Sequence, residues 1–286
     1  MKGADILLEA LKREGVEIIF GYPGGMLIGL YDRLYDCDIK HILPRHEQGG
    51  AHAAEGYAKA SGKVGVCMGT SGPGATNLVT GIADAYMDYV PMVVLTGQVL
   101  SSLIGGDAFQ EADIVGITRP IVKHSYLVKD VHELARTVKE AFHLASTGRP
   151  GPVLIDLPFD VQVAEIEFDI DAYEPLPVYK PMASKKQLEK AFSMLCAARK
   201  PVIITGGGVI NADAAALLVE FAELTGVPVI PTLMGWGAIP DDHPLMIGRI
   251  GIQSSHRYAN QSFLQSDFVL GIGNRWANRH TGSIEK

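Results

Sequence analysis

Hydrophobic residues follow two alternating patterns along the first part of the chain. Residues 4–14 carry apolar side chains at helical spacing, and Gly15 follows where such a helix would end. Residues 64–68 and 91–96 are instead short runs that are apolar at nearly every position. Strands that are apolar on both faces and alternate with helices are typical of a parallel sheet covered by helices on both sides. We therefore predict an α/β domain with a parallel sheet.

The same patterns predict the remaining elements. Helices are expected at 4–14, 26–35, 46–61, 75–86, 131–146, 185–198 and 212–225. Strands are expected at 18–20, 40–43, 64–68, 91–96, 152–158, 201–205, 227–231 and 268–273. In the first domain, loops follow several strand ends directly. Parallel sheets bind ligands beyond the carboxyl ends of their strands, so these loops are the expected place for functional residues.

The composition changes after residue 160. The segment 161–184 is acidic, carries prolines and shows little helical period, so it is predicted to be an extended linker. A second α/β unit is expected at 185–286, with fewer strands than a Rossmann-like domain usually has. The predicted organisation is a first domain at 1–160, the linker, and a truncated Rossmann-like domain.

Composition excludes some classes of function. The chain has 286 residues and a net charge of −7 without a lysine or arginine run, which argues against nucleic-acid binding through phosphate contacts. The three cysteines have no CxxC spacing, so neither a zinc site nor a disulfide framework is expected. The first residues lack the apolar core of a signal peptide, and no apolar run reaches the roughly 18 residues that span a bilayer. A reduced cytoplasmic protein without a membrane segment is expected.

Candidate chemistry lies in the first loops. Glu47 follows the strand expected at 40–43 and lies between two Gly/Pro turns, 21–25 and 69–77. A glutamate at the start of a helix is ordinarily a surface residue that complements the helix dipole. At the ligand-binding edge of a sheet, the same carboxylate could do acid–base work on a bound cofactor. Both interpretations remain open on spacing alone.

Other motifs also have two interpretations. The turn at 69–77 could cradle a phosphate, although it lacks the lysine of a P-loop, or it could be a plain tight turn. The glycines at 206–208 follow an expected strand but depart from the dinucleotide fingerprint. Arg275 and Arg279 could pair with phosphates or be solvated. The acidic loop at 107–113 could carry a metal, or could direct Phe109 and Gln110 into a cleft.

Taken together, these motifs make the chain resemble the thiamine-diphosphate enzymes of the acetolactate synthase group. The matching segments are 21–25 (Gly-Tyr-Pro-Gly-Gly), 45–49 (Arg-His-Glu-Gln-Gly), 51–58, 69–77, 108–120 and 147–153. They occur in order over most of the chain. The resemblance implies an enzyme that decarboxylates pyruvate and joins the product to a second 2-oxo acid, as in branched-chain amino acid biosynthesis.

The resemblance also implies three domains: one that binds the cofactor's pyrimidine, a central one that binds FAD, and one that binds the diphosphate. The chain would hold the first and part of the second. The Gly-Asp-Gly motif that holds Mg²⁺ and the diphosphate does not occur in the sequence, so the metal ligands are expected in the third domain. The chain is therefore expected to be a fragment that is inactive alone, or alternatively a non-catalytic module. Relatives work as homodimers or tetramers with sites between chains, some with a regulatory subunit.

Individual roles follow from the resemblance. The glutamate matching Glu47 hydrogen-bonds N1′ of the aminopyrimidine, which favours the imino tautomer whose 4′-nitrogen removes the C2 proton. The other residues expected at thiamine diphosphate are Pro23, Thr70, Pro73 and Asn77, with Gly25, Phe109 and Gln110 facing the reacting centre. Those expected at FAD are Arg149, Gly206, Gly207, Gly208, Thr232, Leu233, Gly271, Gly273 and Arg275.

A second resemblance competes in the central region. Residues 157–162, 232–237 and 273–282 are similar to glyoxylate carboligase, which condenses two glyoxylates to tartronate semialdehyde. Acetolactate synthases typically have lysine where Phe159 stands. Glyoxylate carboligase, however, lacks the glutamate that Glu47 supplies. Because the glutamate touches the reaction, the acetolactate synthase type is the primary hypothesis and the carboligase is the alternative.

Overall fold

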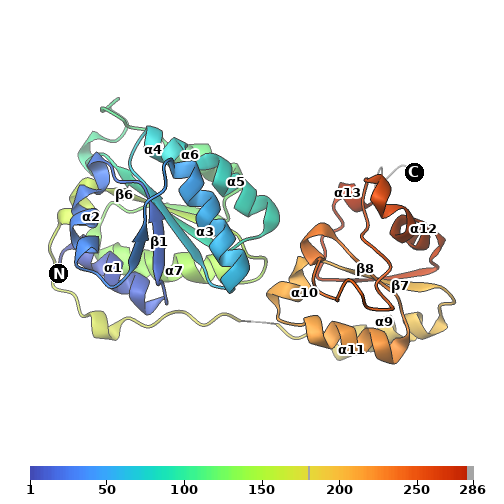
Figure 1. Ribbon diagram of the computed structural model, residues 1–286. Helices are drawn as coiled ribbons and strands as arrows, with labels where there is room; N and C mark the ends of the chain where they lie inside the picture. The colour runs from blue at the N-terminus through green and yellow to red at the C-terminus, as the bar shows by residue number, and fades with distance from the viewer. Residues whose placement is uncertain (180, 282–286) are drawn as a thin grey trace. The chain divides into compact units, whose positions relative to one another are not determined.

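A computed structural model describes residues 1–179 and 181–281 of the chain (Figure 1). The chain divides into two compact units, Met1–Lys180 and Pro181–Lys286, and each is described by itself. Residues 180 and 282–286, which belong to the expected linker and second domain, lie outside the described residues. No helix in the described part is both long enough and apolar enough to cross a membrane.

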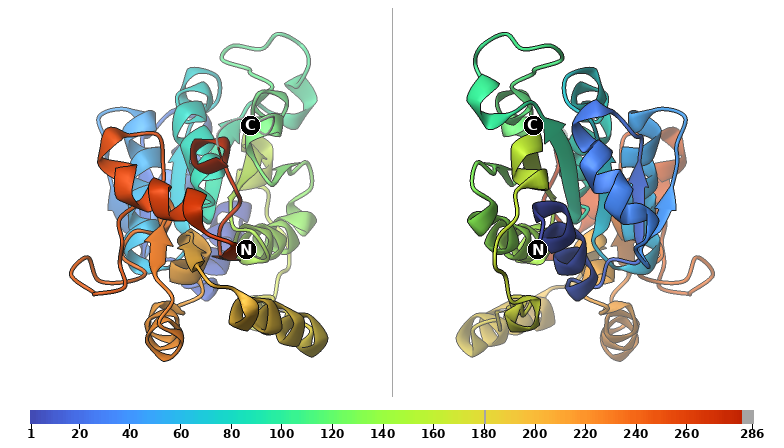
Figure 2. Two further views of the ribbon diagram at one scale, coloured as in Figure 1. Left: turned by 90° about the vertical axis from the view of Figure 1, so that its right-hand side faces the viewer. Right: turned by 90° about the vertical axis from the view of Figure 1, so that its left-hand side faces the viewer.

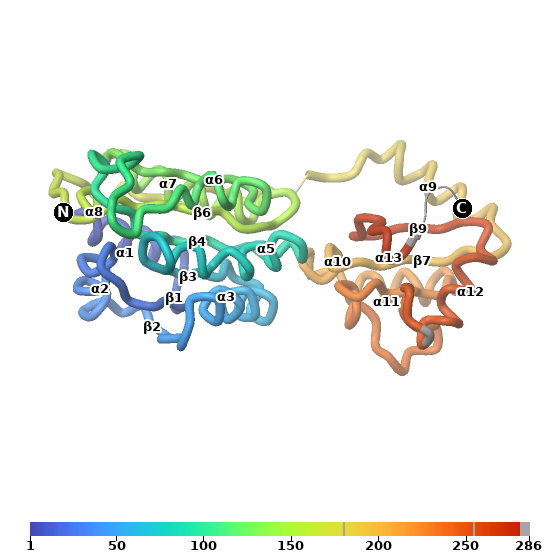
Figure 3. The backbone as a smooth tube through the Cα atoms, turned by 90° about the horizontal axis from the view of Figure 1, so that it is seen from above, coloured from blue at the N-terminus to red at the C-terminus, as the bar shows by residue number. Residues whose placement is uncertain are grey.

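The first unit is built on a six-stranded parallel sheet, as the apolar runs predict. Its strands are β1 (Ile18–Gly21), β2 (Lys40–Ile42), β3 (Gly65–Gly69), β4 (Met92–Gln98), β5 (His124–Leu127) and β6 (Pro152–Pro158). Its helices are α1 (Gly3–Arg13), α2 (Ile28–Tyr35), α3 (Glu47–Ser61), α4 (Pro73–Thr76), α5 (Val79–Asp88), α6 (Ile114–Thr118), α7 (Leu134–Ser146) and α8 (Phe159–Val163). The order is β2-β1-β3-β4-β6-β5, and Figure 3 shows β1, β3 and β4 side by side.

Alternate strand residues bury themselves in two separate cores. Val66 and Met68 of β3 pack with α1, α2 and α7, while Cys67 between them packs with α3 and α5. Helices α1 and α7 lie against each other on the first of these faces (Figure 2). This is the two-sided cover that a parallel sheet requires, and it explains why the strands lack polar alternation.

Short single-turn helices complete this unit. They are η1 (Gly25–Leu27), η2 (Ser101–Leu103), η3 (Arg119–Ile121), η4 (Val131–Glu133) and η5 (Ile170–Ala172). Two helices expected to be continuous are therefore divided: the one at 26–35 begins as η1, and the one at 75–86 is split into α4 and α5. Strand β5 was not expected, because its sequence His-Ser-Tyr-Leu lacks an apolar run.

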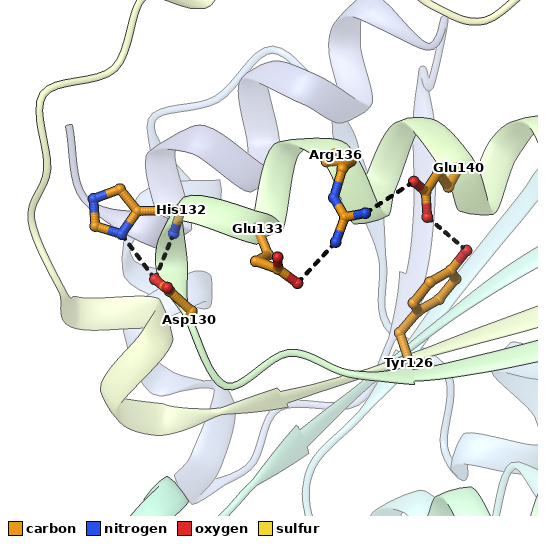
Figure 4. Close-up of polar contacts among 6 residues, drawn as sticks. All are labelled: Tyr126, Asp130, His132, Glu133, Arg136 and Glu140. Atoms are coloured by element: carbon orange, nitrogen blue, oxygen red, sulfur yellow. Dashed lines mark hydrogen bonds and ion pairs between the residues drawn. The ribbon is translucent and has the colours of Figure 1, made fainter.

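Strand β5 and helix α7 are joined by a chain of polar contacts on the surface (Figure 4). The Tyr126 hydroxyl donates to Glu140 Oε2 at 3.1 Å, and Arg136 bridges Glu140 and Glu133. Burial and the hydrogen bond to Glu140 raise the pKa of Tyr126 to about 12. The contact between Tyr126 and Glu140 attaches the edge strand β5 to helix α7.

The start of the predicted linker packs on the first unit. The amino group of Met1 donates to Ile166 O at 2.6 Å, and the hydroxyl of Tyr173 donates to Glu14 at 2.6 Å. Tyr173 is 4% exposed and belongs to the core beneath α1. Residues 161–173 thus contact α1 from its start to its end, and the contact boundary falls later, at residue 180.

The second unit has a three-stranded parallel sheet in the order β8-β7-β9. Its strands are β7 (Pro201–Thr205), β8 (Val229–Pro231) and β9 (Phe268–Ile272). Its helices are α9 (Lys185–Ala197), α10 (Gly207–Asn211), α11 (Ala215–Thr225), α12 (Arg257–Gln265) and α13 (Asn278–Thr281), with η6 (Leu233–Gly235) and η7 (Ser254–His256). One sheet face packs with α9 and α11, and the other with α12.

Candidate functional site

The sheet order creates a crevice between β1 and β3. The chain leaves β1 for α2 on one face of the sheet, and leaves β3 for α4 and α5 on the other face. Loops that depart in opposite directions from adjacent parallel strands leave an opening at their carboxyl ends, where α/β proteins bind ligands. The turns at 21–25 and 69–77 border this opening.

Glu47 lies at the crevice as the first residue of α3. It is only 9% exposed, so it is not the solvated residue that the dipole interpretation describes. Its Oε2 accepts a hydrogen bond from Asn77 Nδ2 at 2.9 Å, across 30 residues of sequence. The free backbone N–H groups at the N-terminus of α3 favour a negative charge at this position. The structure therefore brings together a buried carboxylate and the amide that orients it.

Glycines allow the two turns to close around Thr70. A Cβ added to Gly24 would lie 2.4 Å from Thr70 Cβ, and one added to Gly74 would lie 2.7 Å from Thr70 Cγ2. The Thr70 hydroxyl accepts a hydrogen bond from the backbone amide of Met26 at 3.1 Å. The same added Cβ at Gly74 would lie 3.3 Å from Glu47 Oε1. The missing side chains thus keep backbone close to the carboxylate, as a ligand-facing turn requires.

The loop after β4 approaches the same turn. Gln110 has a left-handed φ of 56°, and its carbonyl oxygen lies 2.5 Å from where a Gly72 Cβ would be. Phe109 is 84% exposed beside it. Both carboxylate oxygens of Glu111 accept backbone amides, from Gly105 at 2.5 Å and Ala108 at 3.0 Å, and these bonds lower its pKa. The acidic residue therefore organises the loop instead of presenting a metal ligand.

Sequence reasoning missed Tyr31 of α2. Its hydroxyl is buried and has no hydrogen-bond partner among the described residues. Burial raises the pKa of Tyr31, and the nearby charge of Glu47 raises it further. Its ring contacts His41 edge-on, and a His41 nitrogen lies 2.8 Å from the carbonyl of Gly21. No local pattern distinguishes this tyrosine from others on an amphipathic helix.

The second unit has its own candidate site at the strand ends. The amide of Gly208 donates to the carbonyl of Gly273 at 2.9 Å, and a Cβ on Gly206 would lie 2.3 Å from that oxygen. Thr232, 3% exposed, accepts a hydrogen bond from the amide of Gly235. Three turns thus meet where β7, β8 and β9 end.

Two buried polar atoms at this second site have no hydrogen-bond partner among the described residues. They are Thr205 Oγ1 and Asn274 Oδ1, although the Asn274 amide donates to Ile204 O at 3.0 Å. Buried polar atoms are normally satisfied, so an unsatisfied pair is a sign of an absent ligand or water. Of the other residues expected at FAD, Leu233 and Arg275 are exposed. Arg149 lies in the first unit, with its guanidinium 3.4 Å above the ring of Tyr89.

Known families match both units. The family described as thiamine pyrophosphate enzyme, N-terminal TPP binding domain, matches residues 1–117. The family described as thiamine pyrophosphate enzyme, central domain, matches residues 188–286. The six-stranded parallel sheet, the crevice and the second parallel sheet agree with these matches. The chain belongs to the thiamine pyrophosphate enzymes and carries their N-terminal and central domains.

Similar proteins carry two names. The glyoxylate carboligase of Escherichia coli O157:H7 is 54% identical, with 100% of this chain and 49% of that protein aligned. A probable acetolactate synthase large subunit of Methanocaldococcus jannaschii is 51% identical over 99% of this chain and 49% of its own length. The acetolactate synthase of Arthrospira platensis is 50% identical over 98% and 50%. The chain spans about half the length of these relatives.

Proposed function

We propose that the whole protein is a thiamine-diphosphate-dependent carboligase of the acetolactate synthase type. Two molecules of pyruvate and one proton would give one acetolactate and one CO₂. The observation that carries this proposal is the buried Glu47 carboxylate, held by Asn77 at the crevice between β1 and β3. Relatives named acetolactate synthase, which are 51% and 50% identical to this chain, support the proposal.

The residues at the crevice fit an aminopyrimidine. Thiamine diphosphate, when bound, supplies the electron sink that decarboxylation of a 2-oxo acid needs. Asn77 keeps one oxygen of Glu47 in place, so the other, Oε1, can share a proton with a ring nitrogen. The glycine turns around Thr70 admit a flat ring close to backbone, and Pro23 and Pro73 stiffen those turns. Gly25, Phe109 and Gln110 border the opening and would meet the 2-oxo acid.

The glyoxylate reaction is the second candidate. A relative named glyoxylate carboligase is 54% identical over the whole chain. In that reaction two glyoxylates and one proton would give tartronate semialdehyde and CO₂. The glyoxylate reaction does not require a glutamate at this position, whereas the acetolactate synthase resemblance includes one at position 47, which favours pyruvate as the donor.

FAD is proposed for the second unit. The glycines at 206–208 and Gly273 form a turn into which a Cβ would not fit, so backbone there can approach a dinucleotide. The unsatisfied atoms of Thr205 and Asn274 offer polar groups for it. Thr232, Leu233, Gly271 and Arg275 lie on the neighbouring strand ends. Arg149 is proposed as an FAD contact on the resemblance alone. Mg²⁺ is proposed to accompany the diphosphate on ligands outside this chain.

A partner chain is proposed to cover the crevice. Large apolar side chains are exposed at this edge of the sheet: Phe109 at 84%, Ile28 at 63% and Leu43 at 60%. Exposed apolar groups gathered around a polar opening are typical of an interaction surface. A homodimer or tetramer would bury them and close the site.

Product analysis tests the reaction. The whole protein is supplied with thiamine diphosphate, Mg²⁺ and FAD, and given pyruvate or glyoxylate separately. We expect acetolactate from pyruvate, and no product when thiamine diphosphate is omitted. Tartronate semialdehyde from glyoxylate, without acetolactate from pyruvate, would replace the first candidate by the second. The absence of both products would contradict both candidates and would favour a non-catalytic module.

A further inference from the structure

Gln98, the last residue of β4, is a buried glutamine whose carboxamide is fully used. It is 4% exposed. Its Nε2 donates to the carbonyl of Ala112 at 3.0 Å and to Asp156 Oδ2 at 3.0 Å. Its Oε1 accepts the amide of Val99 at 2.9 Å. One side chain therefore ties together the two ends of the loop that carries Phe109 and Gln110.

Gln162 of α8 makes an analogous pair of hydrogen bonds elsewhere. It is 2% exposed, and its Nε2 donates to the carbonyl of Met26 at 2.7 Å and to that of Leu157 at 3.0 Å. The amide of Met26 is held by Thr70, so this peptide segment is fixed from both sides. A Cβ on Gly97 would lie 2.9 Å from the Met26 carbonyl, so the strand beneath also supports it.

Both glutamines hold backbone that borders the crevice. Met26 follows Gly25 directly, and Ala112 lies two residues after Gln110. Phe109 and Gln110 at the loop tip are exposed, so their positions depend on the contacts that hold the loop backbone: those of Glu111 within the loop and the anchor Gln98 at its ends. A catalytic loop displaced by about 1 Å can lose a large part of its rate advantage.

We propose that Gln98 and Gln162 are positioning residues that hold the two substrate-facing loops of the crevice. Gln98 would fix the loop at 99–113, and Gln162 would fix the turn at 24–27. The assignment of these loops to the 2-oxo acid rests on the proposed function. The hydrogen bonds that hold them do not.

Hydrogen exchange measured by mass spectrometry tests each anchor against the other. Gln98→Met and Gln162→Met keep the side-chain length but remove the donor. Gln98→Met removes three hydrogen bonds, and the loss of even one corresponds to about tenfold. We therefore expect exchange to speed up by at least about tenfold in peptides covering 99–113, with peptides covering 22–30 unchanged. Gln162→Met should show the reverse. Should Gln98→Met fail to fold, Gln98→Asn provides a shorter carboxamide that cannot span both partners.

Similar acceleration of both segments in either variant, or of neither, would overturn the proposal, because a general loss of packing is not selective. A second measurement uses the whole protein with its 2-oxo acid. Both variants should raise KM about tenfold while proton exchange at C2 of bound thiamine diphosphate stays as in the wild type. An equally large effect on KM and on the C2 proton-exchange rate would contradict the positioning role. The amide hydrogen-exchange experiment needs neither cofactor nor substrate. A negative result there would therefore leave the proposed reaction unaffected.

Discussion

Asp156 of β6 gives the sharpest test of the described core. It is 1% exposed, and its carboxylate accepts hydrogen bonds from Thr96 at 2.7 Å and Gln98 at 3.0 Å. Burial raises its pKa from 3.8 to about 7, against the effect of these two hydrogen bonds, and the charge of Asp113 adds to the increase. The folded state therefore binds this proton more tightly than the unfolded chain does.

The sign of the pH dependence follows from the raised pKa. The stabilising effect of the proton is complete below pH 3.8 and is lost as the pH rises to about 7. Each pH unit in that interval corresponds to about 1.4 kcal/mol, so the whole effect is about 4 kcal/mol. In Asp156→Asn the amide can accept from Gln98 and donate to Thr96, which mimics the neutral acid. Between pH 5 and pH 8 the wild type should lose about 3 kcal/mol of unfolding free energy relative to this variant.

Labelling of Cys67 provides the assay. This thiol is 0% exposed in β3, so in increasing urea its labelling rate, normalised to the unfolded chain at the same pH, reports unfolding of the first unit. Asp160→Asn is the matched control. Burial alone would raise the pKa of Asp160, but hydrogen bonds from Ser101 outweigh burial and lower it. The stability that the ionised Asp160 contributes is therefore lost only at acid pH. An equal difference in unfolding free energy between wild type and Asp156→Asn at pH 5 and pH 8 would show that the pKa of Asp156 is not raised in the folded state.

Two further substitutions probe the crevice by the same assay. Gly74→Ala places a methyl group 2.7 Å from Thr70, so we expect a loss of about 1–3 kcal/mol, whereas Gly56→Ala, with nothing within 4 Å, should cost nothing. An equal effect of both changes would show that crowding at Thr70 is not the cause. Tyr31→Phe removes a buried hydroxyl without a partner among the described residues, so it should be neutral or stabilising by about 1 kcal/mol, while Tyr173→Phe should destabilise by about 1 kcal/mol. A clear loss for Tyr31→Phe would mean that its hydroxyl is satisfied.

The sequence predicted the parts of the fold that local patterns encode. The apolar runs at 64–68 and 91–96 were recognisable as central strands because strands buried on both faces are apolar at nearly every position. Strand β5 escaped notice because its register depends on pairing with β6, and its own sequence is half polar. The helix expected at 75–86 is divided at residues 77 and 78, where Asn77 turns toward Glu47.

The sequence was sufficient to predict the glycines and the carboxylate of the candidate site. It was not sufficient to predict the residues that hold the surrounding loops. Glu47 and the glycine turns were identifiable because strand ends and turn residues are local signals. Gln98 and Gln162 were not, because each has a partner that is distant in the chain: Gln98 and Asp156 are 58 residues apart, and Gln162 and Met26 are 136 residues apart. Their roles come from tertiary contacts alone, so no spacing rule could have pointed to them.

The most direct test of the central claim is deuterium exchange at C2 of thiamine diphosphate bound to the whole protein, compared between wild type and Glu47→Gln. A glutamine keeps the hydrogen bond with Asn77 through its oxygen but cannot exchange a proton with the ring nitrogen. We expect the C2 exchange rate to fall at least about a hundredfold, the usual contribution of a positioned acid–base group, while the protection of Cys67 from labelling is unchanged. An exchange rate equal to that of the wild type would mean that Glu47 has no part in activating the cofactor, and the proposed role of this carboxylate would be wrong.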